Sequence, residues 1–320
     1  MSLHQRLLVR ASSFVLGTSG RQRLSILIYH RVLKERDGMR PLELTAKQFS
    51  WQMELVSREF VPLSLSNALD LLEEGRLPDR AVCVTFDDGY ADNEDVALPI
   101  LRKYRIPATV FIASKFINGG RMWNDTVVES IRSLESESID LGAVGMGCYK
   151  LTTIDLKRAA AGDIINQIKH LAGDRREEVV DHLQQYSDTL PDNLMLNDAQ
   201  ICSLRDNDVE LGAHTYSHPI LANLSCDEVL QEIEKGRHIL ESVISKPVQY
   251  FAYPNGKPVT DYLPEHRDIV KEMGFRAAVS TVWGVSDKNT DKWQLPRFTP
   301  WDKSDNKFSL RMVLNTRNLR

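Results

Sequence analysis

Two adjacent carboxylates, Asp87 and Asp88, are the residues whose chemistry stands out first. They lie in the segment TFDDG at 85–89, at the end of an apolar run. Neighbouring carboxylates at the end of a buried strand repel each other and lose hydration unless a cation or hydrogen bonds compensate. Taken alone, the tripeptide Asp87-Asp88-Gly89 is equally consistent with a turn that carries two solvated aspartates.

Two histidines, His214 and His218, form a second candidate group in the segment HTYSH, which follows the apolar run VELGA. Imidazoles four residues apart can face one metal ion from a helical turn or from a loop at the end of a strand. The pattern is not the zincin motif, because no Glu follows the first His. With Asp88, the pair would form a two-His, one-carboxylate set that leaves coordination positions open for water and substrate.

Polar residues also follow two other apolar runs. In FAYPNG at 251–256, proline and glycine predict an exposed turn, whose backbone N–H groups could point at a developing oxyanion. The simpler interpretation is a turn that ends a strand. In Tyr29-His30-Arg31, His30 could act as a general acid near neutral pH, or it could be a buried structural histidine.

The elements that must position these residues alternate along the chain from residue 24 onward. Apolar runs predict strands at 24–30, 80–89, 108–114, 209–215, 248–254 and 275–281. Helical patterns are predicted at about 45–59, 92–104 and 265–273, in a short segment ending near Gly75, and after Ser225. Thr45 with Gln48 and Ser225 with Glu228 have capping-box spacing. Strands separated by helices predict parallel pairing, and about six to eight such units favour an α/β barrel, whose active sites lie at the carboxyl ends of the strands.

Residues 118–200 interrupt this alternation. They are rich in charged residues and show helical periodicity, which predicts a mostly helical insertion that is either a lid or partner surface or a solvated elaboration. Trp123, beside Asn124 and Asp125, could stack on a sugar ring or pack the insertion onto the barrel. Trp283 and Trp293 leave the same alternatives open.

The two ends of the chain are predicted to lie outside the barrel. Residues 1–23 form an amphipathic segment, either a docked terminal helix or a weak membrane-surface anchor. Its apolar patch is too short to span a bilayer, and it lacks the cleavage site of a secretory signal. Residues 301–320 are expected to be a C-terminal tail.

Composition narrows the class of protein. The 320 residues have 42% hydrophobic content and a net charge of -4 without a strongly basic stretch, so a nucleic acid is not an expected partner. None of the four cysteines stands in a C-x-x-C pair, which predicts free thiols in a reducing compartment. The expected location is therefore cytoplasmic, with possible weak membrane-surface contact through the N-terminus.

Together, the segments at 85–89, 214–218 and 251–256 resemble the three motifs of the polysaccharide deacetylase family, carbohydrate esterase family four, with its NodB-homology domain. Tyr29-His30-Arg31-Val32 and Leu295-Pro296-Arg297 recur in a subgroup of such proteins. The resemblance covers about residues 24–118 and 201–300. It implies an α/β fold, a distorted (β/α)7-type barrel over residues 24–300, and it does not explain the insertion.

The resemblance also implies roles for individual residues. Those assigned to the metal, usually zinc, are Asp88, His214 and His218. Asp87 would be the catalytic base, and the backbone N–H of Asn255 would help to form the oxyanion hole, with Tyr253 in the same oxyanion or substrate-binding segment.

Two departures from the family pattern leave positions to be filled. The third motif usually carries an arginine that orients the base, and Ala252 stands in its place. We take Arg297 as its candidate replacement. The late leucine–histidine motif that supplies the general acid is not visible near the C-terminus, and His30 is the candidate substitute.

The implied activity is metal-dependent amide hydrolysis. The N-acetyl group would leave an N-acetylhexosamine unit of a glycan, a glycolipid or a lipid-linked saccharide, and an N-acetylated saccharide is the expected binding partner. Two alternatives remain at this point. One is hydrolysis of a cyclic or other non-sugar amide on the same fold, and the other is a non-catalytic carbohydrate-binding protein on a degenerate barrel.

Overall fold

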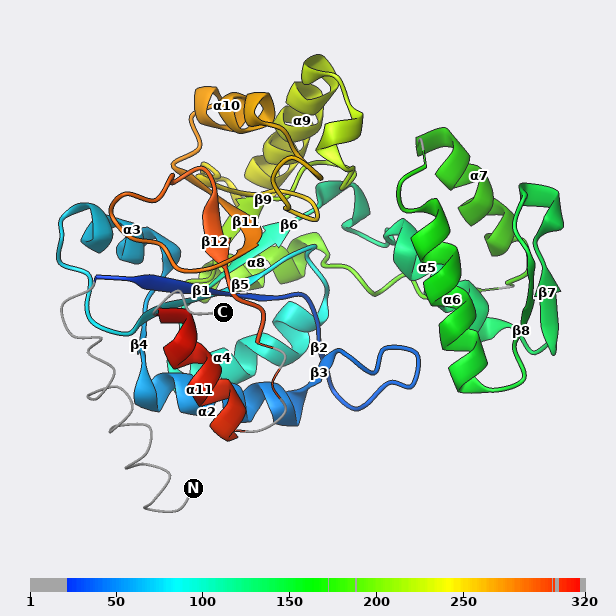
Figure 1. The fold of residues 1–320 in the computed structure, drawn as a ribbon, viewed down its shortest axis with the longest axis horizontal. Coiled ribbons are helices and arrows are strands. Elements are labelled where there is room, and N and C mark those ends of the chain that lie inside the picture. The colour runs from blue at the N-terminus through cyan, green and yellow to red at the C-terminus, as the bar shows by residue number, and fades with distance from the viewer. Residues whose placement is uncertain (1–21, 172, 188, 301, 303–304, 317–320) are drawn as a thin grey trace.

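The computed structural model describes residues 22–171, 173–187, 189–300, 302 and 305–316. Its centre is a parallel sheet (Figure 1). In spatial order the strands are β1 (Leu24–Tyr29), β5 (Ala81–Phe86), β6 (Ala108–Ile112), β9 (Glu210–Ala213), β10 (Tyr250–Ala252), β11 (Ala277–Trp283) and β12 (Leu295–Arg297). Phe298, just beyond β12, exchanges backbone hydrogen bonds of 2.7 and 3.0 Å with Ile26 and Ile28 of β1. The sheet therefore nearly closes into the predicted distorted seven-stranded barrel.

The central strands end where their polar residues begin. Every residue of β1 and of β5 is buried, as expected for parallel strands covered on both faces. The two strands pair from Leu24 with Ala81 to Tyr29 with Phe86. Asp87 extends this ladder by one bond, since its N–H donates to the carbonyl of Tyr29 at 2.9 Å. The first carboxylate thus stands at the carboxyl end of the barrel.

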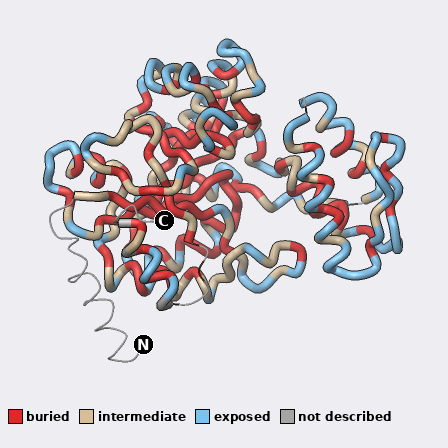
Figure 2. The backbone as a smooth tube through the Cα atoms, in the orientation of Figure 1, coloured by how far each residue is buried: buried red, intermediate tan, exposed pale blue. Residues whose placement is uncertain are grey.

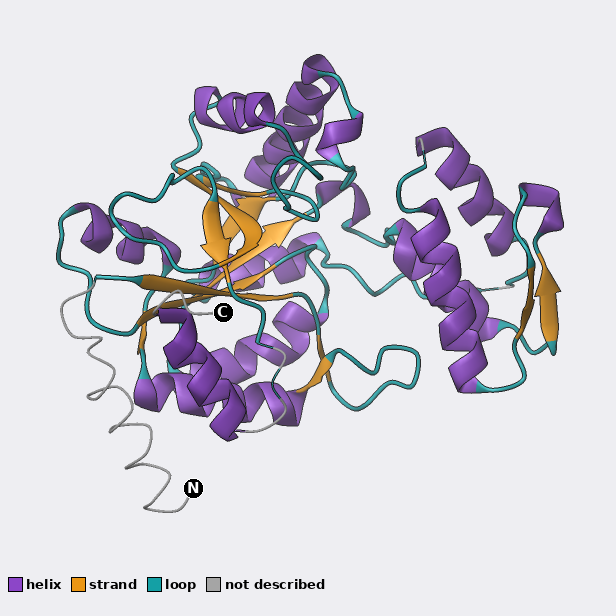
Figure 3. Cartoon of the chain, viewed as in Figure 1, coloured by secondary structure: helices purple, strands orange, loops and turns teal. Residues whose placement is uncertain are grey.

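Helices cover the outside of the barrel (Figure 3). They are α2 (Ala46–Glu59), α3 (Leu65–Glu73), α4 (Leu98–Tyr104), α8 (Asp198–Asp206), α9 (Cys226–Ile244) and α10 (Pro264–Glu272). Both predicted capping boxes are present, at Thr45 before α2 and at Ser225 before α9. A π-helical turn, Asn93–Ala97, precedes α4 within the segment that was predicted to be regular helix.

Short strands complete the edges of the fold. Strand β4 (Val61–Pro62) pairs with β5 beside the main path of the sheet. Strands β2 (Val32–Leu33) and β3 (Leu44–Thr45) pair with each other in parallel. The loop between them, residues 34–43, extends toward the insertion (Figure 1).

Between β6 and α8 the chain forms a separate lobe, residues 123–184, which we call the insertion lobe. It contains helices α5 (Trp123–Ser133), α6 (Ile154–Ile168) and α7 (Gly173–Gln184) and an antiparallel hairpin of β7 (Ser138–Asp140) and β8 (Cys148–Lys150). Val127, Ile131 and Ile164 are fully buried in its own apolar core, separate from that of the barrel (Figure 2). The mostly helical character was predicted. The hairpin was not, because strands of three half-exposed residues leave little alternation to detect.

Part of the expected C-terminal tail is helical. Helix α11 (Asp305–Thr316) packs Phe308 and Met312, both fully buried, against the barrel, and the Phe308 ring meets the edge of Trp51 at 5.7 Å. The amphipathic segment predicted at residues 1–23 lies outside the described residues except for its last two. Within the described part of the chain, every helix is too short or too polar to cross a membrane.

Candidate metal centre and catalytic site

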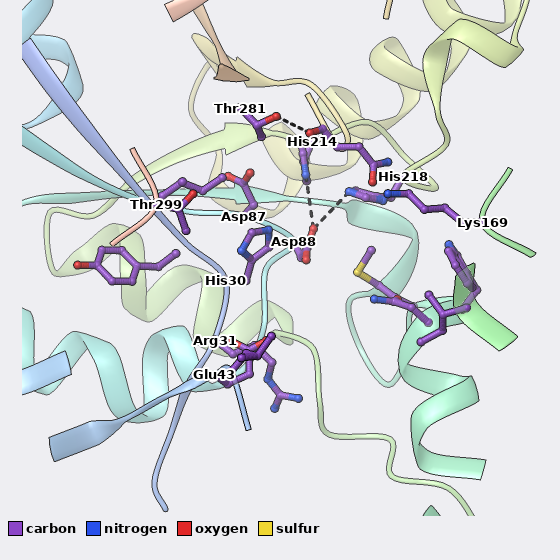
Figure 4. Close-up of a pocket in the computed structure, with 18 of the residues that line it drawn as sticks. His30, Arg31, Glu43, Asp87, Asp88, Lys169, His214, His218, Thr281 and Thr299 are labelled. Carbon is purple, nitrogen blue, oxygen red and sulfur yellow. Dashed lines mark hydrogen bonds and ion pairs between the residues drawn. The ribbon is translucent and has the colours of Figure 1, made fainter. Parts of the chain in front are cut away.

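The polar residues predicted at the strand ends meet in one cavity of about 550 Å³ at the carboxyl end of the barrel (Figure 4). Its walls include His30 after β1, Asp87 and Asp88 after β5, His214 and His218 after β9, and Asn255 after β10. The insertion lobe forms the opposite wall through residues of α5, α6 and α7 and of the α6–α7 connection. Segments far apart in the sequence therefore share a single site.

Asp88, His214 and His218 form the one group of metal-ligand type found among the described residues, with ligand atoms within 4.8 Å of one another. Asp88 Oδ1 lies 3.5 Å from His214 Nε2 and 3.4 Å from His218 Nε2. This oxygen is buried and has no hydrogen-bond partner among the residues that the structure describes. A buried carboxylate oxygen without a partner is costly, and a cation between it and the two ring nitrogens would satisfy it. The donor set therefore fits a divalent metal ion.

The orientation of His214 also suits a metal ligand. Its Nδ1 lies 2.7 Å from the carbonyl oxygen of Ala252, which assigns the proton to Nδ1 because a carbonyl only accepts. Its Nε2 lone pair then faces Asp88. A backbone carbonyl that holds the far nitrogen in this way is the usual support of a metal-bound histidine. Ala252 thus contributes through its main chain at the position where the family motif has an arginine.

The charges around the site favour a bound cation, because the carboxylates of Asp87 and Asp88 lie beside the two histidines. Burial alone would raise the pKa of Asp88, but the neighbouring His214 and His218 outweigh it and hold that pKa well below its usual range. Burial lowers the pKa of His218 to about 4, which keeps its ring neutral and able to bind a metal at neutral pH. Burial also opposes charge on His214, but the neighbouring carboxylates of Asp88 and Asp87 outweigh it and raise the pKa of His214.

Asp87 has a different partner. Arg297, itself only 1% exposed, donates from Nη1 and Nη2 to the two Asp87 carboxylate oxygens at 2.7 and 2.6 Å. Its Nε donates to the carbonyl of Ser280 at 2.8 Å, which fixes the plane of the guanidinium. Burial would raise the pKa of Asp87, but Arg297 more than compensates and lowers it. The contact expected from the Leu295-Pro296-Arg297 segment is therefore present, and it reaches across the barrel from β12.

His30 is exposed on the cavity wall, and Figure 4 shows its ring beside Asp87 and Asp88. The alternative of a buried structural histidine is therefore wrong. Asn93 in the π-helical turn donates from Nδ2 to the His30 carbonyl at 2.8 Å. Asp92 accepts from Arg31 Nε at 2.8 Å. Such π-turns often occur at functional sites, and here the turn holds the segment that carries His30.

Asn255 lines the cavity in a left-handed backbone conformation, with φ 57°. Its carbonyl accepts a hydrogen bond of 2.7 Å from Thr281 Oγ1. The predicted turn is present, with Gly256 also at positive φ, but the prediction that it is exposed is wrong, because Pro254 and Gly256 are buried. The backbone at Asn255 is thereby held at the edge of the cavity.

Tyr253 does not reach the cavity. Its side chain is fully buried, its hydroxyl donates to the Trp293 carbonyl at 3.0 Å, and its ring stacks on Tyr262 at 3.8 Å between centroids. Its backbone N–H donates to Val279. We therefore correct the interpretation of Tyr253 as an oxyanion or substrate residue. Residues along an extended segment alternate in direction, and the chain turns toward the cavity only beyond Pro254.

Four non-glycine residues of the site have left-handed backbone conformations. They are Asp88, Thr215, His218 and Asn255, with φ between 55° and 76°. Such conformations cost about 1–3 kcal/mol each and persist where surrounding structure imposes them. Gly89, at φ 85°, makes the turn predicted after the two aspartates without this cost.

Helix α9 holds the loop that carries the two histidines. The helix was predicted from the sequence, but this contact was not. Glu232 accepts from the backbone N–H of Tyr216 and Ser217 at 3.1 and 2.8 Å and from Ser217 Oγ at 2.7 Å. Gly236 permits the close approach, since a Cβ there would lie 2.6 Å from the carbonyl carbon of Thr215. A helical Glu on an ordinary capped helix carries no local signal for this role.

Of the tryptophans considered for sugar stacking, Trp123 lines the cavity and also packs on the core of the insertion lobe. Trp283 meets the edge of Phe298 at 4.4 Å, and Trp293 Nε1 donates to a backbone carbonyl at 3.0 Å. Neither contributes to the cavity wall. Asp125 is fully buried, so it is not positioned to bind a sugar.

Part of the chain matches a known protein family. Residues 74–278 match the model of the family described as polysaccharide deacetylase. This match covers more than half of the chain. The chain therefore belongs to the polysaccharide deacetylase family.

Two curated relatives and one solved structure illustrate the similarity. YxkH of Bacillus subtilis, whose name assigns it to the polysaccharide deacetylases, is 31% identical over 124 residues, 37% of this chain and 43% of YxkH. The poly-β-1,6-N-acetyl-D-glucosamine N-deacetylase of Staphylococcus epidermidis is 28% identical over 167 residues, 45% of this chain and 57% of that protein. The chain spans about half the length of the curated relatives it matches.

The deacetylase PplD of Streptococcus pyogenes, solved in complex with acetate, aligns with a TM-score of 0.61 at 18% identity, over 91% of this chain and 98% of that chain. At this level of identity the likeness concerns the fold.

Proposed function

We propose that this protein is a divalent-metal-dependent amide hydrolase that removes the N-acetyl group from an N-acetylhexosamine unit of a glycan, a glycolipid or a lipid-linked saccharide. The observation that carries this proposal is the orphan oxygen of Asp88 between two histidines, next to the Asp87–Arg297 pair. Family membership supports a saccharide amide as the substrate. The name of the Staphylococcus epidermidis relative describes removal of the N-acetyl group from N-acetylglucosamine in that protein.

Asp88, His214 and His218 would hold the cation, and we propose Zn²⁺ because catalytic zinc sites use this kind of donor set. A bound divalent cation supplies Lewis-acid chemistry, since it lowers the pKa of water and polarises a carbonyl. Three protein ligands leave room for both water and the acetamide oxygen.

Asp87 serves as the general base in this proposal. Its lowered pKa keeps the carboxylate ionised at neutral pH, and Arg297 holds both of its oxygens in place. The carboxylate takes a proton from the water that attacks the acetamide carbonyl. A positioned base of this kind contributes a factor of about 10²–10⁴ in rate.

His30 and Asn255 serve the later steps. An amide nitrogen leaves poorly unless it is protonated, and His30 lines the same cavity as Asp87, so we assign it the proton donation. The backbone N–H of Asn255, held at the cavity edge, is assigned to stabilise the tetrahedral oxyanion. The products are acetate and a free amino sugar.

The direct test is acetate release from N-acetylglucosamine oligomers by the purified protein, with its metal content measured. We expect release that chelation abolishes and Zn²⁺ restores. Activity that survives complete metal removal would refute the metal-dependent mechanism. Ring opening of a cyclic imide without acetate release would assign the site to a non-sugar amide. Saccharide binding without hydrolysis under any divalent metal would assign the protein a non-catalytic role.

A further inference from the structure

The wall of the cavity formed by the insertion lobe carries two cations that the proposed reaction does not use. Lys169, the C-cap residue that follows α6, and Arg176, in the first turn of α7, both line the cavity. In Figure 4 the Lys169 side chain extends into the cavity on the side of His218. These residues lie in the insertion, which the family motifs leave unexplained.

Neither cation has a carboxylate partner in the structure, in contrast to the cations around them. Arg31, on the barrel side of the same cavity, pairs with Asp92 at 2.8 Å. Among the described residues, no carboxylate oxygen lies within 4.0 Å of the Lys169 or Arg176 side-chain nitrogens. Glu177, next to Arg176 in sequence, is 3.6 Å from Lys115 instead.

Arg176 is partly buried, and among the described residues its charge and one of its N–H donors lack a partner that would offset the loss of hydration. Its Nε is buried and finds no hydrogen-bond partner in the described part of the chain, and its guanidinium lies 5.2 Å from the centre of the Trp123 ring. Burial lowers the pKa of Arg176, and Glu177 only partly offsets that effect. A buried donor of this kind is normally satisfied, so an acceptor in the cavity would complete it.

The charges on the barrel side do not supply that acceptor. Asp87 is already paired with Arg297 through both oxygens. The open oxygen of Asp88 faces His214 and His218.

Glu43 is the third carboxylate of the cavity wall, and it lies near His30, Arg31 and Arg40. Among the described residues, the lobe side of the cavity therefore presents two cations without a carboxylate partner. Isolated cations that converge on one pocket attract an anionic ligand.

We propose that Lys169 and Arg176 form a subsite for an anionic group, a phosphate or a carboxylate, carried by the saccharide that is deacetylated. This inference rests on the proposed function, because it places the anion on the same substrate as the acetamide. A guanidinium suits either group through paired N–H donors, and an ammonium adds a compact charge. Trp123 and Ile165 on the same wall would cover the apolar part of the saccharide next to it.

The test compares three probes: diacetylchitobiose, which is neutral; its 1-phosphate; and a hyaluronan tetrasaccharide, which carries carboxylates. Calorimetry on the chelated protein measures binding without direct coordination of the anion to a metal. We expect one of the two anionic probes to bind about 10–100 times more tightly than the neutral one, the range that one or two charge-assisted hydrogen bonds produce. The preferred probe identifies phosphate or carboxylate as the natural group.

The variant Lys169→Ala/Arg176→Ala should remove that preference. The matched control is Lys150→Ala/Lys288→Ala, which deletes two exposed cations outside the cavity and changes the net charge equally. Arg176→Lys, which keeps the charge but loses the paired donors, should fall between the wild type and the double variant. It also keeps the test decisive if the double variant does not fold.

Two failures can be told apart. Equal binding of neutral and anionic probes, or a preference that persists in the double variant, would overturn the anionic subsite even if acetate is released from diacetylchitobiose. Absence of acetate release from every probe by the Zn²⁺-loaded protein would instead overturn the proposed function. A ratio of kcat/KM between anionic and neutral probes that falls in the double variant but not in the control would support the subsite during turnover.

Discussion

The barrel and the insertion lobe face each other across one cavity but hold their polar residues differently. On the barrel side Arg297 grips Asp87, and the Ala252 carbonyl orients His214. On the lobe side Lys169 and Arg176 line the cavity, and within the described part of the chain they have no carboxylate partner. This difference indicates that the polar residues of the barrel are preorganised for chemistry. In our proposal, the cations of the lobe are paired only when a substrate with an anionic group binds.

The two regions also have separate apolar cores, joined by the 34–43 loop, whose Met39 packs into the lobe core and whose charged residues form a polar seam with α5. Asp125 of α5 accepts hydrogen bonds from Tyr90 at 2.9 Å and from Arg40 of the 34–43 loop at 2.6 Å. Arg132 of α5 reaches Asp37 of the same loop. Burial raises the pKa of Asp125, although Arg40 opposes that effect. Loss of either partner would leave a buried group unpaired and destabilise the seam. Such a joint can orient the lobe without merging the two apolar interiors.

The largest effect is expected from Asp87→Asn, which tests the barrel as the seat of chemistry. The amide cannot accept the proton of the attacking water, so kcat should fall by about 10²–10⁴. Metal content, measured by mass spectrometry, should remain one ion per chain because Asp87 is outside the ligand group. A variant that retained wild-type turnover with normal metal content would remove Asp87 from the mechanism.

The next largest effect is expected from His30→Ala, which is tested by comparing substrates whose leaving groups do or do not need a proton. In His30→Ala, acetate release from an N-acetyl sugar should slow by about 10²-fold, because the amine must be protonated as it departs. Hydrolysis of 4-nitrophenyl acetate should change little, since nitrophenolate leaves without a proton.

The control for His30 is His170→Ala, which removes an exposed histidine of the lobe outside the cavity. Equal slowing of the amide and the activated ester by His30→Ala would indicate a structural effect. An unchanged rate with both substrates would leave the general acid unassigned.

Arg297→Ala tests how far the barrel depends on a buried pair. Removal of the cation leaves Asp87 buried without its partner, which should cost about 3–5 kcal/mol in free energy of unfolding. Arg297 lowers the pKa of Asp87, so the pair stabilises the fold fully above the unfolded pKa of about 3.9 and loses this effect as pH falls through the folded value. The stability difference between wild type and variant should therefore shrink in acid.

The same substitution should move the acid limb of kcat/KM to higher pH, because the pKa of Asp87 rises without Arg297. Arg297→Lys keeps a charge without the fork and is the folded control if Arg297→Ala does not accumulate. If the acid limb of the kcat/KM profile stayed at the wild-type pH in both Arg297→Lys and Arg297→Ala, Arg297 would not control the pKa of Asp87.

The smallest effect on chemistry is expected from Ile164→Ala, which challenges the separation of the two cores. Truncation of this fully buried side chain should cost the lobe about 2–5 kcal/mol. Hydrogen exchange should speed up in α5, α6 and α7, while β5 and β6 keep their protection.

Val110→Ala, in the barrel core, is the matched variant and should raise exchange in the barrel strands. If Ile164→Ala exposed β5 and β6 as much as the lobe helices, the two regions would unfold as one unit and the comparison between them would fail.

Much of the barrel was predictable because its signals are local. Buried apolar runs mark the strands, the capping boxes at Thr45 and Ser225 mark helix starts, and polar residues at strand ends mark the cavity. The hairpin β7–β8 and helix α11 were missed. Their short or half-exposed segments depend on what they pack against and leave no periodic signal of their own.

The sequence by itself determined which residues could do chemistry, namely carboxylates and imidazoles after buried strands. Through the family resemblance it also pointed to an arginine late in the chain, because Ala252 stands where the family motif usually has one. Only the tertiary structure decided their partners. It directed Tyr253 inward, gave Arg297 to Asp87 and left one oxygen of Asp88 open to two histidines. It also brought Lys169 and Arg176 to the same cavity. Local pattern encodes burial and turns, whereas contacts between distant segments exist only once the barrel closes and the lobe docks beside it.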